Sequence, residues 1–83
     1  MERFYCVFDS KTEQFAFPFH AKSDVEVVRS IDSDFKRNSE SIYVLYPEDF
    51  SVWFVGEFNQ DSGEFVSVSK VKVADFTDFV KKD

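Results

Sequence analysis

The chain has 83 residues, of which 43% are hydrophobic and 19% are aromatic. Ten Lys and Arg residues against 16 Asp and Glu residues give a formal net charge of −6. This charge argues against strong non-specific DNA binding, because dedicated nucleic-acid binders carry a basic footprint, whereas it favours basic protein partners. The single cysteine excludes a disulfide framework, and no run approaches the ~18 apolar residues of a membrane-spanning helix. We expect one intracellular domain over residues 1–83, with no signal peptide and no membrane insertion.

Aromatic rings supply most of the apolar volume of this short chain. A domain of this size buries only about 60–65% of its unfolded surface. The 12 Phe, 3 Tyr and 1 Trp residues can each bury roughly 150–250 Å². Two interpretations follow: all of the rings lie in the core and at its boundary, or some of them lie at a subunit or ligand surface.

The first predicted element is a strand over Phe4–Phe8, where FYCVF is dense in β-forming residues. We expect it to be buried on both faces of a sheet. The cysteine within it, Cys6, is expected to be a buried thiol, since this stretch offers no nearby base that would activate it. A polar break follows at residues 9–13.

The next segment alternates Phe15, Phe17 and Phe19 with smaller or polar residues, which is the spacing of an extended chain. Pro18 cannot donate a hydrogen bond to a neighbouring strand. We therefore predict an edge strand or an extended arm. Regular alternation would place the three rings on one face, packed inward.

A helix is predicted from about Asp24 to Lys36. Ser23 and Glu26 match a capping box, in which Ser23 is the N-cap and Glu26 reaches back to it. The apolar positions follow at helical spacing and are Val27, Val28, Ile31 and Phe35. The β-branched residues among them have modest helix propensity, so the helix needs tertiary packing, and a sheet face is the expected surface.

The segment Ile42–Tyr46 is predicted as a short strand that Pro47 ends, with a turn over Pro47–Asp49. A β-hairpin follows, with arms Phe50–Phe58 and Glu64–Ser69. Its connection at residues 59–63 contains Asn, Asp, Ser and Gly, which are turn-forming residues.

The second arm is expected to continue through residues 70–73, where lysine and valine alternate and protect an edge strand against pairing with other chains. Residues Ala74–Val80 predict a short C-terminal helix, with Phe76, Phe79 and Val80 on one side and Lys81 and Lys82 near its end. Its apolar face is expected to close the core; the alternative is a second subunit.

The summed prediction is an α+β fold. It consists of an antiparallel sheet of three to five strands built on a central β-hairpin, one main helix packed on one face, and a short C-terminal helix.

Catalytic and metal chemistry lack their usual residues in this chain. One histidine, His20, and one cysteine cannot build a histidine-based triad or a structural zinc site. Two glycines exclude a glycine-rich phosphate loop of the G-x-G-x-x-G type. The acidic pairs have no EF-hand spacing. We therefore predict a protein that is not an enzyme, with no catalytic residues, no metal and no cofactor.

Two kinds of binding remain. The first is single-stranded nucleic acid, since rings and basic residues on a sheet can stack bases and follow phosphates. The candidate stacking rings are Trp53, Phe65 and Tyr43, and the candidate basic residues are Lys70, Lys72, Arg3, Arg29, Lys36 and Arg37. The second is protein–protein binding by an acidic module that self-associates as a homodimer and recruits a basic partner. Alternatively, Trp53 is part of the core and the lysines form a solvated edge.

The order of several motifs resembles a viral family. The motifs are FYCVFDSKTE at residues 4–13, FPF at 17–19, Val28-Arg29 in the predicted helix, YPEDF at 46–50, GEF at 56–58 and DSG at 61–63. In this order they resemble the small nonstructural protein of gokushoviruses, which are single-stranded DNA phages of the Microviridae. The sequence departs from that pattern at residues 70–73 and in a helix that is less rich in alanine.

The resemblance implies a protein of the infected cell, in the host cytoplasm, that is not a capsid component. It also implies a counterpart of the microvirus protein that switches genome replication to single-strand packaging. Such a role implies contact with phage replication proteins, procapsid proteins or single-stranded DNA. The family names no catalytic residues, so the resemblance assigns none to this chain.

Overall fold

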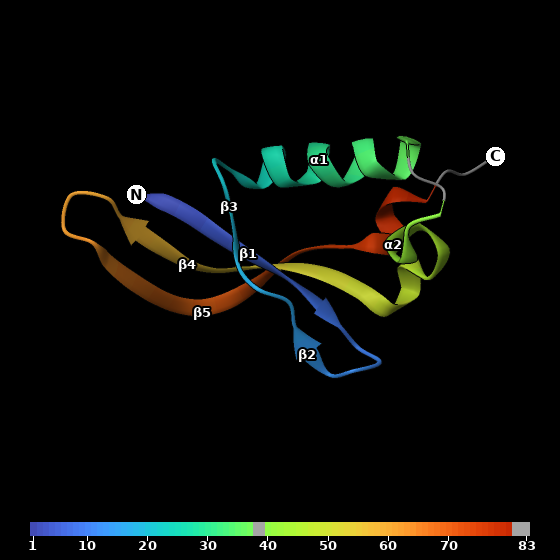
Figure 1. Ribbon diagram of the computed structural model, residues 1–83, viewed down its shortest axis with the longest axis horizontal. Helices are drawn as coiled ribbons and strands as arrows, with labels where there is room; N and C mark the ends of the chain where they lie inside the picture. Colours follow the sequence, from blue (N-terminus) through green and yellow to red (C-terminus); the bar gives the residue numbers. More distant parts are fainter. Residues whose placement is uncertain (38–39, 81–83) are drawn as a thin grey trace.

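The predicted hairpin consists of β4 (Phe50–Asn59) and β5 (Glu64–Asp75) in the computed structural model, which describes residues 1–37 and 40–80 (Figure 1). In its turn the Gly63 amide donates to the Asn59 carbonyl at 2.8 Å, and the Asn59 side chain accepts from the Asp61 amide at 2.9 Å. Gly63 has a φ of 74°, which a residue with a Cβ rarely adopts. The second arm runs through Asp75, two residues beyond the predicted alternation.

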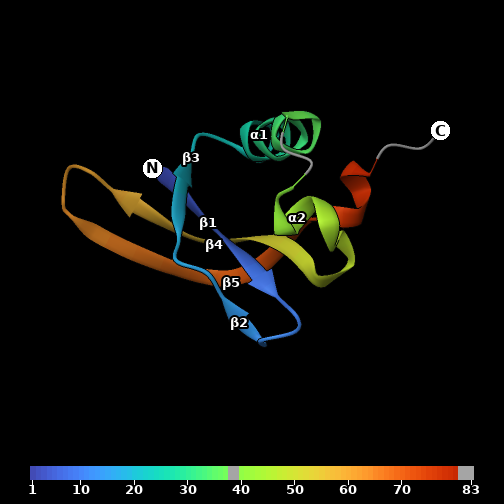
Figure 2. The same ribbon diagram turned by 45° about the vertical axis from the view of Figure 1, so that its right-hand side comes forward.

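The sheet is antiparallel, and β1 (Glu2–Asp9) lies inside it. On one side β1 pairs with β4, and on the other it pairs with two short strands, β2 (Gln14–Phe15) and β3 (Phe19–Ala21). β5 pairs with β4 at the other end of the order β2-β1-β4-β5. Register shifts interrupt both long pairings, and such bulges increase strand twist, so that the sheet curls strongly (Figures 1 and 2).

The predicted main helix is α1 (Asp24–Arg37), which covers one face of the sheet (Figure 1). The Ser23 hydroxyl accepts from the Glu26 amide at 3.2 Å, as the capping box requires. The Glu26 carboxylate accepts from the Lys22 amide at 3.4 Å, one residue before the cap, and so only half of the box forms as predicted. None of the helices in the described ranges has both the length and the apolarity to cross a bilayer.

The face of the sheet beneath α1, hereafter the helix face, carries the core. Its buried residues are Tyr5, Ala21, Val27, Ile31, Phe50, Val52 and Phe76. A polar group fastens the start of α1 to β1: the Tyr5 hydroxyl donates to the Asp24 carboxylate at 2.7 Å, and Arg3 donates to both, at 2.8 Å and 3.0 Å. The Arg3 guanidinium also lies 3.9 Å from the centre of the Phe54 ring. The prediction for β1 holds only at its centre, where Tyr5 and Cys6 are buried.

The predicted edge strand is present as β2 and β3, but the prediction that Phe15, Phe17 and Phe19 share one inward face is wrong. Phe15 pairs with Phe8, but Phe19 pairs with Tyr5, so the register advances by one residue between β2 and β3. This extra residue puts Phe15 and Phe19 on opposite faces. Phe17 lies in the break between the strands and is 94% exposed. The register shift has a physical cause in Pro18, which has no N–H to donate and so interrupts the pairing with β1.

The predicted strand Ile42–Tyr46 is instead a short helix, α2 (Ile42–Leu45), followed by the 3-10 turn η1 (Pro47–Asp49). The Ser41 hydroxyl caps α2 by accepting from the Tyr43 amide at 3.2 Å, which is a local signal stronger than strand propensity here. The predicted C-terminal helix is a single 3-10 turn, η2 (Phe76–Phe79), with a capping box between Asp75 and Asp78. Phe76 closes the core as predicted.

The expected basic end of that helix, Lys81 and Lys82, lies outside the described residues. The prediction of an α+β fold is confirmed in its sheet, its central hairpin and its one main helix.

Candidate nucleic-acid interface

The face of the sheet opposite α1 is not covered by a helix from the described part of the chain (Figures 1 and 2). We call it the open face. Its aromatic members are Phe4, Phe8, Phe15, Trp53, Phe58 and Phe65. They form two clusters that follow one another along β1.

The first cluster joins three strands around Trp53. The Phe15 ring lies 4.7 Å from the Phe8 ring and 6.3 Å from the Trp53 ring, measured between centroids. The Trp53 indole nitrogen donates to the Ser51 hydroxyl at 2.9 Å, which fixes the orientation of the indole. The Lys70 ammonium lies 6.0 Å from the centres of both the Phe15 and Trp53 rings. A cation is therefore held beside two partly exposed aromatic rings.

A hollow of about 410 Å³ lies next to this cluster. Its lining includes Phe15, Lys70 and the exposed serines Ser67 and Ser69. These serines belong to the irregular part of β5, where the register with β4 shifts. The bulge thus brings hydroxyl groups and an ammonium group to one side of a ring, which is the set of contacts that a nucleotide needs for its phosphate and base.

The second cluster lies near the hairpin turn and centres on Phe4. Its ring lies 6.4 Å from Phe58, 5.4 Å from Phe65 and 5.7 Å from His20. Phe65 covers the backbone of Gly56, because a Cβ at Gly56 would stand only 2.4 Å from the Phe65 ring. The glycine therefore lets a half-exposed ring approach the strand backbone closely.

Charges on the open face are partly paired. Lys72 stands opposite Trp53 in the ladder and so lies on the same face as Lys70, as predicted. Its ammonium also contacts the Asp75 carboxylate at 3.2 Å. His20 contacts Glu2 at 2.5 Å at the other end of the face. The positive field of the open face is therefore modest, and Lys70 is the basic residue placed directly over its rings.

The structure brings four of the predicted residues to the open face: Trp53, Phe65, Lys70 and Lys72. It places the other five elsewhere. Tyr43 packs edge-on against core rings, 4.8 Å from Phe50, and so offers no stacking face. Arg3 lies on the helix face in contact with Asp24.

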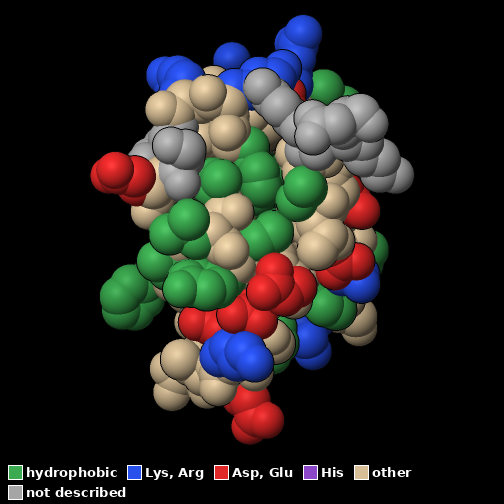
Figure 3. Space-filling view, turned by 90° about the vertical axis from the view of Figure 1, so that its right-hand side faces the viewer, with side chains coloured by type: hydrophobic (Ala, Val, Ile, Leu, Met, Phe, Trp, Pro, Cys, Tyr) green, Lys and Arg blue, Asp and Glu red, His purple; other side chains and the backbone are tan. Residues whose placement is uncertain are grey.

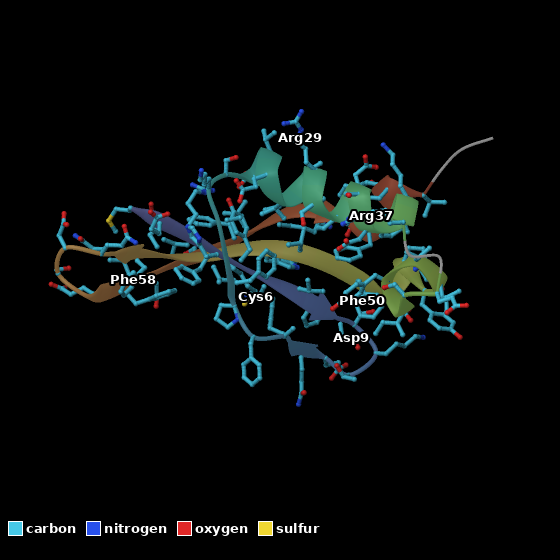
Figure 4. All side chains as sticks on the ribbon, turned by 45° about the horizontal axis from the view of Figure 1, so that its top comes forward. Cys6, Asp9, Arg29, Arg37, Phe50 and Phe58 are labelled. Carbon is cyan, nitrogen blue, oxygen red and sulfur yellow. The ribbon has the colours of Figure 1, made fainter. Side chains whose placement is uncertain are left out.

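Three basic residues of the prediction belong to α1. Figure 4 shows that Arg29 points away from the sheet. Lys36 contacts Asp32 at 3.0 Å and Arg37 contacts Asp34 at 3.5 Å, both along the helix surface. The basic track expected from the sequence is thus divided between two sides of the molecule.

Sequence reasoning missed the remaining rings of the open face. Phe4 and Phe8 alternate with Tyr5 and Val7 along β1, and this period of two is the signal that could have assigned them to the face opposite the core. Phe15 gave no such signal, since its face depends on the register shift between β2 and β3.

The reactive groups near this face are few. Cys6 is buried beneath the rings, and burial raises the pKa of its thiol, so it stays protonated at neutral pH. Within residues 1–37 and 40–80, no three potential ligands come together to hold a metal ion. The open face therefore presents stacking surfaces, hydroxyls and an ammonium group.

The fold and the open face together define a small α+β protein with one covered and one ring-bearing sheet face. Residues 2–79 match the model of a family described as Phage ORF5 protein. The chain belongs to this phage protein family. Searches of the curated proteins and of the solved structures found no match.

Proposed function

We propose that this phage protein binds single-stranded DNA on its open face, without catalysis. The observation that carries the proposal is the position of Lys70, whose ammonium lies 6.0 Å from both the Phe15 and Trp53 rings. A base stacked on either ring would bring its phosphate within reach of this ammonium.

The geometry suits single strands rather than duplexes. Exposed rings stack unpaired bases, which every base permits, and so the binding is expected to be tolerant of sequence. The hydroxyls of Ser67 and Ser69 offer further contacts to phosphate or sugar oxygens in the adjoining hollow. A duplex keeps its bases stacked on one another and offers the rings nothing comparable.

The charge of the protein limits the affinity. A net charge of −6 repels DNA at long range. If Lys70 and Lys72 each neutralise one phosphate, the logarithm of the binding constant should fall with the logarithm of salt concentration with a slope of roughly −1.4, about −0.7 per contact. We expect weak binding that suits a regulatory contact better than a continuous coat.

We propose the biological setting from the order of motifs given above. We assign the protein to gokushoviruses and place it in the host cytoplasm. There it assists the replication or packaging of the single-stranded genome, in contact with phage replication or procapsid proteins. Membership of a phage protein family supports this setting.

The test is a fluorescence-anisotropy titration of a labelled single-stranded oligonucleotide at two salt concentrations. Lys70→Gln should weaken binding several-fold and make the salt slope shallower by about 0.7. Arg29→Gln is the matched control, because it removes the same charge from the outer side of α1 and should leave both the affinity and the slope close to those of the native protein.

Loss of stacking is tested separately. Trp53→Ala should weaken binding roughly 5- to 150-fold, the range that corresponds to one stacked base. Circular dichroism should first establish that the variant folds. The absence of binding even at low salt, or equal weakening by Lys70→Gln and Arg29→Gln, would contradict the proposal.

A further inference from the structure

The short helix α2 turns its apolar stripe away from the core. Ile42, Leu45 and Tyr46 follow one another at helical spacing and are 56%, 54% and 54% exposed. Only Tyr43 of this segment packs firmly inward, where its ring lies 5.2 Å from Phe76. A helix that folds onto its own domain normally buries such a stripe.

The neighbouring turn extends this apolar surface. Val80, directly after η2, is 45% exposed, and together with Phe35, Val44 and Phe79 it lines a groove of about 260 Å³. Figure 3 shows hydrophobic side chains gathered over this end of the molecule. We call Ile42, Leu45, Tyr46 and Val80 the end surface.

Charges of opposite sign flank the end surface. α1 ends at this end of the molecule with Lys36 and Arg37, and Figure 4 labels Arg37 there. Both side chains are exposed and contact carboxylates of their own helix, Lys36 with Asp32 and Arg37 with Asp34, so each must exchange a surface ion pair to contact a second copy. The turn η1, next to α2, contributes Glu48 and Asp49. In Figure 3 Lys and Arg side chains lie along the upper border of the hydrophobic area, and Asp and Glu side chains lie along its lower border, where Lys and Arg side chains stand beside them.

We propose that the end surface is the interface of a homodimer. When two copies meet face to face across a two-fold axis that runs between the two borders, the basic border of each copy faces the acidic border of the other. Leu45 and its apolar neighbours then lose their contact with water, while Arg37 and Glu48 form two equivalent ion pairs around them. A second copy thus covers the apolar side chains and pairs the charged ones through the same surface.

The size of the surface sets the strength of the dimer. The molecule measures 47 × 25 × 18 Å, and the end surface occupies an end set by the two shorter dimensions. The area of such an end is below the ~800 Å² per partner of a standard interface. We therefore expect a weak dimer whose population depends on protein concentration.

Most of the end surface is separate from the proposed DNA-binding face. Leu45, Tyr46 and Val80 lie outside the strands that form the open face, whereas Ile42 lines a hollow together with Phe15 of that face. If both proposals hold, one dimer presents two open faces to a single strand and gains affinity through effective concentration.

Sedimentation velocity over a concentration series up to about 1 mM measures the association directly. The native chain should shift from monomer to dimer across the series. Leu45→Lys places a charge within the apolar area and should weaken the dimer at least about tenfold. Phe17→Lys is the matched control: it changes a residue that is 94% exposed and lies outside the end surface, and the dimer should keep its native strength.

A charge exchange tests the two-fold arrangement without touching the apolar residues. Arg37→Glu alone and Glu48→Lys alone should each weaken the dimer, because like charges then face each other at both borders. An equimolar mixture of R37E and E48K should restore native strength, since in the mixed dimer every pair again joins opposite charges.

Four results overturn the inference: a monomer at every concentration, a native-strength dimer in L45K, equal weakening by F17K, or no recovery in the mixture. Circular dichroism of each variant separates a lost interface from a lost fold, and the charge variants change only exposed side chains.

Discussion

The helix face and the open face use similar side chains in opposite states. On the helix face, Tyr5 and Val52 are fully buried beneath α1. On the open face, Trp53 and Phe65, which come from the same hairpin, keep solvent-exposed surface. Hydrophobicity does not distinguish the two sets; coverage does, because one long helix can cover only one face of the sheet. Rings left on the other face are available for binding.

Truncating one ring on each face is the most direct test of the difference between the helix face and the open face. Phe76→Ala removes a ring that is 2% exposed and packs on the helix face, and it should cost about 3–5 kcal/mol of unfolding free energy. Phe15→Ala on the open face should cost about 1 kcal/mol, because much of this ring already contacts water. Urea unfolding of both variants measures the difference, and equal losses would show that the open face is a second core.

A smaller loss of stability is expected at Gly56, where the Phe65 ring of the open face packs against the strand backbone. In Gly56→Ala the new Cβ would stand 2.4 Å from the Phe65 ring and 2.9 Å from the Val66 carbonyl oxygen. We expect a loss of about 1–3 kcal/mol. Adding Phe65→Ala should recover the part caused by the ring and leave the part caused by the backbone, which a double-mutant cycle separates. Strict additivity of the two substitutions would argue against this contact.

The polar group on the helix face should give the smallest effect, with a distinct pH signature. Tyr5→Phe removes the hydrogen bond to Asp24 and should cost about 1–2 kcal/mol at neutral pH. Burial raises the pKa of Tyr5 above 10.0, its ordinary value. The unfolded chain therefore ionises first as pH rises, and the native protein loses stability above about pH 10 as Tyr5 titrates.

The corresponding measurement is the unfolding free energy of the native protein and of Y5F between about pH 8 and pH 11. The gap between the two proteins should narrow toward the alkaline end. A constant gap would mean that Tyr5 ionises in the folded and unfolded states at the same pH.

The hairpin and α1 were predictable because their signals are local. The Asn59–Gly63 turn residues, the Ser23 cap and the helical spacing of Val27 and Ile31 act within a few positions of the elements that they define. The prediction of a strand at residues 42–46 was wrong because it was based on strand propensity alone. The cap from Ser41 and the contact of Tyr43 with Phe50 favour a helix.

The candidate site was predictable in part. Trp53, Lys70 and Lys72 were assigned together because they belong to paired strands of one hairpin, whose alternation can be read directly. Arg3 and the basic residues of α1 were predicted to extend the same track but lie on the other side of the sheet from Lys70, since charge alone does not report on which side of a sheet a residue lies. Phe15 required the long-range register with β1.

The break between β2 and β3 also affects how this chain tolerates changes in length. The extra residue between Phe15 and Phe19 is the difference between two short strands and one continuous strand. Removing Pro18, which has no N–H to donate, would restore regular pairing and still leave the two rings on their present faces, because their partners Phe8 and Tyr5 are an odd number of positions apart. A one-residue deletion, which in most strands moves every following side chain to the wrong face, is compatible with the fold at this position.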